Sequence, residues 1–264
     1  MGAFNAKLNP NKRARINMSQ INNYPSEPRD TQGLFLLAIK QSLKTARYLW
    51  PLIILFTVCT QLTQLTSGVS DEIPKLILSV FYMLVGYFLL NAMLCRGHQS
   101  YSNAQGWSLP PLRYWLNLTS IFLCFLIPAC AWNYWVLHSD VSETMTLIWV
   151  LLLATVLVGS YLLTLFLYPL LAFQDLSFKQ SLIASSYFVR QNWIRAGIIY
   201  TIFVFIVIIS LPSSGHMIWL AQYHLNIPGA LLIYFCLLPI AINFWLLITV
   251  DSQLRYPHVV SKGL

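Results

Sequence analysis

The sequence predicts an all-α fold: a polytopic membrane helical bundle with six transmembrane helices in three hairpins. Each hairpin is expected to follow a cytoplasmic interfacial helix or aromatic segment. The first observation is composition, since 57% of the 264 residues are hydrophobic and 9% are charged, against about 25% charged in soluble proteins. The second is a set of apolar runs long enough to cross a hydrocarbon core of about 30 Å. The third is the unequal distribution of lysine and arginine between alternate loops.

The N-terminal segment, residues 1–32, is polar and contains Asn, Ser and Pro. It lacks the apolar central region of a cleavable signal peptide. We predict that it forms a disordered cytoplasmic tail. The six-span transmembrane domain is then expected over residues 33–252, and a cytoplasmic C-terminal tail over residues 253–264.

The stretch GLFLLAIKQSLKTARYLW, residues 33–50, precedes the first span and is amphipathic at helical spacing. Its apolar arc contains Phe35, Ile39, Leu43, Ala46 and Trp50. The cations beside that arc are Lys40, Lys44 and Arg47. This pattern is typical of a helix in the cytoplasmic interface, with its cations near lipid head groups. The alternative is that the helix only covers the end of the bundle and its cations follow the positive-inside rule.

Six segments are apolar and long enough to span the membrane. They are approximately residues 48–67, 74–95, 114–137, 145–172, 194–211 and 229–250. Pro128, Pro169 and Pro239 are expected to kink the third, fourth and sixth of them.

The basic residues predict the orientation, because cytoplasmic loops retain positive charge. Those assigned to the cytoplasm are Lys7, Lys12, Arg13, Arg15, Arg29, Lys40, Lys44, Arg47, Arg96, Arg113, Lys179, Arg190, Arg195, Arg255 and Lys262. Only Lys75 remains for the other side, which instead carries Asp71, Glu72, Asp140 and Glu143. Both termini are therefore expected in the cytoplasm.

The tetrapeptide KQSL occurs at residues 40–43 and again at 179–182. The second copy begins a less cleanly amphipathic segment before span five, in which Lys179 and Arg190 are further candidates for head-group contact. A weaker third segment, over residues 103–120, precedes span three. We interpret these as three units, each an interfacial segment followed by a transmembrane hairpin.

The run LFLYPLLAFQDLSFKQSLIASSYFVRQNWIRAG combines a proline within a span, a short acidic turn and an aromatic entry to the next span. It resembles a pattern in uncharacterised bacterial six-span inner-membrane families, the YciC-like and glycerophosphoryl diester phosphodiesterase membrane-domain-like groups. The likeness covers mainly residues 160–200. It implies a bacterial inner-membrane location and a helical bundle with interfacial helices. It implies no catalytic residue.

No ionisable residue lies deep in a predicted span, where charge would indicate function. Arg96, Arg195 and Asp251 are expected at cytoplasmic ends with access to water. Polar side chains within the spans include a stripe in span one and single residues elsewhere: Thr57, Thr60, Gln61, Gln64, Asn91, Ser160, Thr164 and Asn243. These residues either line a polar path for a solute or form interhelical hydrogen bonds, each worth about 0.6 kcal/mol.

The sequence contains no HExxH, GxSxG, P-loop or dinucleotide fingerprint. His138, His216 and His224 fall on the predicted outer side, in a spacing that matches no metal motif. The sequence therefore predicts no catalytic residue, no cofactor, no metal and no nucleic-acid partner. The expected partners are membrane lipids, with a membrane-protein partner or a homo-oligomer as further options. The leading hypothesis is a non-enzymatic assembly, regulatory or envelope-maintenance factor; the alternatives are a small permease for a neutral or amphiphilic substrate and, third, a membrane-embedded enzyme.

Overall fold

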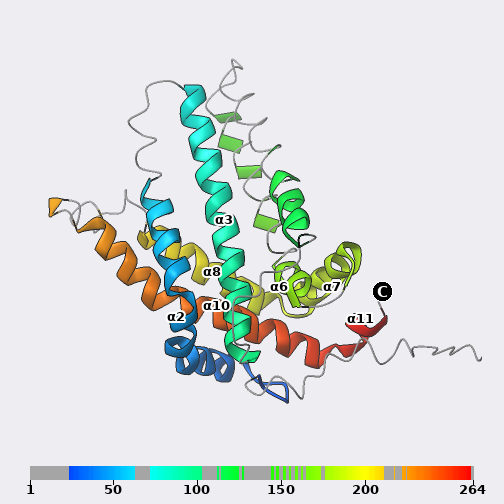
Figure 1. Cartoon of the computed structure of the whole chain (residues 1–264). Coiled ribbons are helices and arrows are strands. Elements are labelled where there is room, and N and C mark those ends of the chain that lie inside the picture. Colours follow the sequence, from blue (N-terminus) through cyan, green and yellow to red (C-terminus); the bar gives the residue numbers. More distant parts are fainter. Residues whose placement is uncertain are drawn as a thin grey trace, which may run out of the picture.

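The computed structural model describes residues 24–62, 72–102, 114–124, 165–173, 176–210 and 225–262, with isolated residues between these ranges. Its labelled elements are α2 (Thr31–Leu62), α3 (Glu72–Ser102), α6 (Leu167–Phe173), α7 (Phe178–Gln191), α8 (Trp193–Ser210), α10 (Asn226–Arg255) and α11 (Pro257–Lys262) (Figure 1). A shorter apolar helix covers Tyr114–Cys124. The described part of the chain contains no strand, so the all-α prediction is confirmed there.

Four helices are long and apolar enough to cross a membrane: Thr31–Leu62, Val80–Tyr101, Trp193–Ser210 and Asn226–Arg255. They coincide with predicted spans one, two, five and six. Most of predicted spans three and four lies outside the described residues. The arrangement of six spans in three hairpins therefore stays a prediction, whereas four helices of spanning length and composition are present in the described part of the chain.

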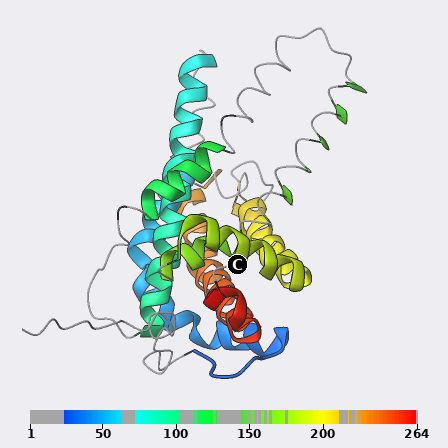
Figure 2. The ribbon, with the colours of Figure 1, turned by 90° about the vertical axis from the view of Figure 1, so that its right-hand side faces the viewer.

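The predicted interfacial segment and span one form one helix, α2. Its first turn is capped by Asp30, whose Oδ1 accepts the backbone N–H of Gly33 at 3.1 Å. Both views show the dark blue start of α2 lying crosswise to its lighter second part (Figures 1 and 2). Pro51 lies within the helix. Because proline has no N–H, the carbonyl of Arg47 loses its helical donor, which accounts for a change of direction in this region.

The core of the bundle forms where α10 crosses α2 and α3 (Figure 1). Every residue of α10 from 241 to 253 is buried. On α3, Gly97 allows a close approach to α10, because a Cβ there would lie 2.9 Å from Cγ2 of Ile242 and 3.2 Å from Cδ1 of Leu246. The absence of a side chain at Gly97 therefore sets the packing distance between α3 and α10.

The second KQSL copy lies in the first turns of α7, whereas the first copy lies ten residues into α2. Ser177 caps α7 through a capping box with Gln180, in which each side chain bonds the backbone N–H of the other residue. α7 ends at Asn192, whose backbone dihedrals are not helical, and α8 begins at once. The first copy thus precedes the apolar second half of the same helix, beyond Pro51, and the second copy precedes a separate apolar helix beyond Asn192.

Candidate functional site

The first half of α2 has a buried face and an exposed apolar face. The buried face, formed by Leu34, Ala38, Thr45 and Leu49, packs into the bundle. Five large apolar side chains on the other side stay exposed: Phe35, Leu36, Ile39, Leu43 and Trp50. We call these five residues the exposed arc. Leu43 is 79% exposed, whereas Ala46, which the sequence placed on the same arc, is buried.

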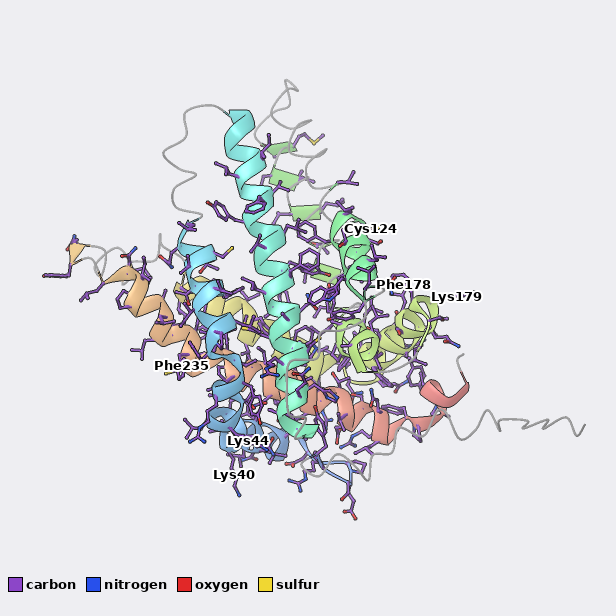
Figure 3. All side chains as sticks on the ribbon, viewed as in Figure 1. Lys40, Lys44, Cys124, Phe178, Lys179 and Phe235 are labelled. Carbon is purple, nitrogen blue, oxygen red and sulfur yellow. The ribbon has the colours of Figure 1, made fainter. Side chains whose placement is uncertain are left out.

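The exposed arc borders the basic stripe predicted from the sequence. Lys40, Lys44 and Arg47 are all exposed on α2, and Figure 3 shows Lys40 and Lys44 at the lower edge of the molecule. Lys179 and Arg190 are exposed on α7, which Figure 3 places on the other side of the bundle from Lys40. The five candidate head-group residues therefore form two separate patches.

Asp251 on α10 is the buried central residue of an ionic cluster, which we call the arginine clasp (Arg29, Arg195, Asp251 and Arg255). One carboxylate oxygen of Asp251 accepts from Nη1 of Arg195 and from Nε of Arg255, the latter at 2.7 Å. The other oxygen accepts the backbone N–H of Arg29 at 2.7 Å. The expectation that Asp251 reaches water is wrong, because its side chain has no exposed surface. Two guanidinium groups and a backbone amide replace water around the carboxylate.

The clasp also holds the segment that precedes α2. Arg195 donates to the carbonyl oxygen of Arg29 at 3.0 Å and to Oγ1 of Thr31 at 3.1 Å. Arg255 donates to the same carbonyl at 2.6 Å. The backbone of residue 29 thus joins α8 to α10, and the starts of α2 and α8 lie together with the end of α10.

Tyr24 fixes the same segment to the end of α3. Its ring stacks on Tyr101, with centroids 4.2 Å apart and an interplanar angle of 11°. Its hydroxyl lies 3.0 Å from Nδ1 of His98. Burial raises the pKa of Tyr24 well above its ordinary value, and the neighbouring Tyr101 raises it further. The helix ends that the charge pattern assigns to the cytoplasm are therefore neighbours in space.

Asn243, a member of the predicted polar set, lies where α2, α3 and α10 meet. Its Oδ1 accepts from Thr45 at 2.9 Å and from Tyr101 at 3.1 Å. Its Nδ2 donates to the carbonyl oxygen of Ala38 at 3.4 Å. These contacts favour interhelical hydrogen bonding over a solute path at this position.

The other described members of the polar set differ in their contacts. Asn91 donates to the carbonyl of Tyr87 at 2.9 Å and accepts from Tyr114 at 3.2 Å. Thr57 donates to a backbone carbonyl of its own helix. Gln61 is 5% exposed, and neither its Nε2 nor its Oε1 has a hydrogen-bond partner. Gln64, Ser160 and Thr164 lie outside the described residues.

An aromatic cavity of about 510 Å³ lies among α2, α3, α8 and α10. It is lined by Phe56, Tyr87, Leu90, Phe122, Val158, Tyr168, Tyr200, Phe203, Val204, Ile206, Ile208, Tyr234 and Leu238. Edge-to-face aromatic contacts stabilise the wall of this cavity. In one of them the ring centroids of Phe56 and Tyr234 are 5.2 Å apart. Gln61 and Asn243 do not line it, so this cavity does not connect the predicted polar residues.

The outer histidines His138, His216 and His224 lie outside the described residues. Within the part that is described, no group of three or more His, Cys, Asp or Glu side chains is placed to hold a metal ion. Comparison with protein-family models, curated proteins and solved structures finds no match to this chain. The resemblance of residues 160–200 to six-span inner-membrane families stays a prediction.

Proposed function

We propose that the chain is an integral protein of the bacterial inner membrane that acts without catalysis, through contacts of its cytoplasmic end with lipids or a membrane-protein partner. Assembly, regulation and envelope maintenance are functions of this kind. The observation that carries the proposal is the first half of α2, where the exposed arc adjoins the basic stripe. Because the opposite face of this half-helix is packed into the bundle, the exposed arc and the basic stripe face away from the bundle.

The magnitudes favour a lipid environment for the exposed arc. Burying a large aliphatic side chain is worth about 1.5–3 kcal/mol. A cation near an anionic membrane surface adds about 1 kcal/mol. Leu36, Ile39 and Leu43 are left uncovered by the rest of the described chain, so immersion in acyl chains recovers their burial. The neighbouring lysines then lie at head-group level.

Nitroxide labels on full-length protein in anionic vesicles test this arrangement. A label at Leu43, introduced as L43C in a background without native cysteines, should collide preferentially with oxygen, which partitions into acyl chains. A label at Lys44, introduced as K44C, should collide preferentially with a water-soluble nickel chelate. Preferential access of the nickel chelate to both labels would refute the membrane contact of the exposed arc.

A small permease for a neutral or amphiphilic substrate is the second candidate function. The observation that favours it is the buried, unpartnered amide of Gln61 in the predicted polar stripe of α2. Under this alternative, mass spectrometry of small molecules that co-purify with the protein should detect one defined solute, and the Gln61→Leu variant should lose it. Co-purification of lipids or a protein alone, with no such solute, favours the first candidate.

A further inference from the structure

An apolar groove of about 770 Å³ runs between the start of α2, α8 and α10. Its lining residues are Phe35, Trp193, Ile194, Gly197, Ile198, Thr201, Ile202, Phe205, Ile206, Leu237 and Ile240. The hydroxyl of Thr201 is already bonded to the carbonyl of Gly197. A Cβ at Gly197 would meet nothing within 4 Å, so the groove is open above this residue.

The dimensions of the groove suit a single extended chain. Trp193, Gly197, Thr201 and Phe205 follow one another at intervals of four and share one face of α8. From Trp193 to Ile206 the groove is about 20 Å long, at about 1.5 Å per residue. This length exceeds half of a hydrocarbon core of about 30 Å. Its volume of about 770 Å³ is lined by apolar side chains along that length, which suits an extended hydrocarbon chain.

The Trp193 end of the groove has an interfacial and basic character. Trp193 is 69% exposed, as is common for tryptophan at the membrane–water boundary. The clasp residue Arg195 lies two residues further along α8 and is bonded to the carbonyl oxygen of Arg29. The exposed or partly exposed cations of the clasp and of the first half of α2, which contributes Phe35 to the groove, are Arg29, Lys40, Lys44, Arg47, Arg195 and Arg255. They outnumber the described acids Glu27, Asp30 and Asp251.

Building on the proposed function, we propose that the groove holds an acyl chain of an anionic phospholipid from the cytoplasmic leaflet. The acyl chain lies along the Gly197 face of α8, and the phosphate lies at the Trp193 end. Phe35 belongs both to the groove and to the exposed arc, so lipid that covers the arc continues into the groove. The excess of cations around this end selects an anionic over a zwitterionic head group.

The test uses full-length protein in nanodiscs of phosphatidylglycerol and phosphatidylethanolamine in equal parts, followed by detergent extraction and native mass spectrometry. The wild type should retain one phosphatidylglycerol in preference to phosphatidylethanolamine. Gly197→Trp places an indole where the groove is open and should lower this retention at least tenfold. Leu232→Trp, at a site on α10 that is 67% exposed, is the matched control and should retain lipid like the wild type.

Unchanged retention of phosphatidylglycerol in Gly197→Trp would overturn the proposal, and equal retention of both lipids would overturn the anionic assignment. A shift from dimer to monomer in Gly197→Trp, with lipid retention unchanged, would instead assign the groove to a second copy of the chain. Equal unfolding temperatures of the two tryptophan variants exclude misfolding. If the groove binds no lipid while a label at residue 43 still collides with oxygen, the groove proposal fails and the proposed function stands.

Discussion

Trp245 donates its indole N–H to the carbonyl oxygen of Leu165 at 3.0 Å. In a continuous helix this carbonyl would accept from the N–H of residue 169, but residue 169 is proline. Leu165 and Phe166 form a turn, and α6 begins at Leu167. A side chain of α10 therefore replaces the donor that proline removes, in a part of the bundle where water is excluded.

Trp245→Phe should lower the free energy of unfolding by about 1–3 kcal/mol, because it leaves a buried carbonyl without a donor. Chemical unfolding in detergent, followed by circular dichroism, measures this loss. In a Pro169→Ala background the backbone N–H of residue 169 becomes available to the carbonyl of Leu165. Trp245→Phe should then lower the free energy of unfolding by less. Equal losses in both backgrounds would show that only packing of the indole matters.

Asp251→Ala should lower the free energy of unfolding by about 3–5 kcal/mol, since it leaves the largely buried Arg195 without its partner. The double variant Asp251→Leu with Arg195→Met removes both charges and should recover part of the loss. Arg255→Gln breaks the more exposed ion pair, between Arg255 and Asp251. It should lower the free energy of unfolding by about 1 kcal/mol or less. Thermal unfolding of the purified variants ranks them, and a double variant less stable than the single one would contradict this account.

Gly97→Ala should destabilise the protein, because the new Cβ would lie 2.9 Å from the branched side chain of Ile242. Overpacking of this kind costs about 1–3 kcal/mol. Gly197→Ala is the matched control, because nothing lies within 4 Å of its Cβ and alanine favours helix by about 1 kcal/mol. Gly97→Ala should therefore lower the unfolding temperature, and Gly197→Ala should raise it. Equal changes in the two variants would show that the two glycines lie in similar surroundings.

The topology predicted from basic residues is tested by single cysteines and a membrane-impermeant maleimide. Positions near 70, 140 and 220 should be labelled from the periplasmic side of intact cells. Positions near 105, 185 and 258 should react only after the inner membrane is permeabilised. In the segment around 185 the cysteine is best placed at the exposed Lys179 or Arg190, because Ser185 is buried. Labelling of that cysteine in intact cells would refute an arrangement with both termini in the cytoplasm.

Local patterns in the sequence predicted the parts of the molecule that depend on near neighbours. The spacing of Phe35, Ile39 and Leu43 identified a continuous apolar surface, and the structure leaves that surface exposed. Ala46 is buried although helical spacing placed it on the same arc. The boundary between exposed and buried faces depends on where α10 packs, and the periodicity of one helix does not contain that information.

The arginine clasp could not be derived from the sequence, because its members are far apart along the chain. Arg29 and Asp251 are separated by 222 residues. The spacing of Asp251 and Arg255 at i and i+4 was an available local signal, since such pairs attract on a helix. The burial of the carboxylate depends on Arg195 and on the backbone of residue 29, which arrive from elsewhere in the fold.

The clasp has a consequence for biosynthesis. The backbone of Arg29 is made 222 residues before Asp251. During synthesis Arg195 has no access to that carboxylate until α10 has entered the bundle. A chain that stops before Asp251 would leave the Arg195 guanidinium uncompensated beside the membrane interior. Completion of the bundle is thereby coupled to the synthesis of α10, and chains that lack α10 present a charged, unsatisfied side chain to membrane quality-control proteases.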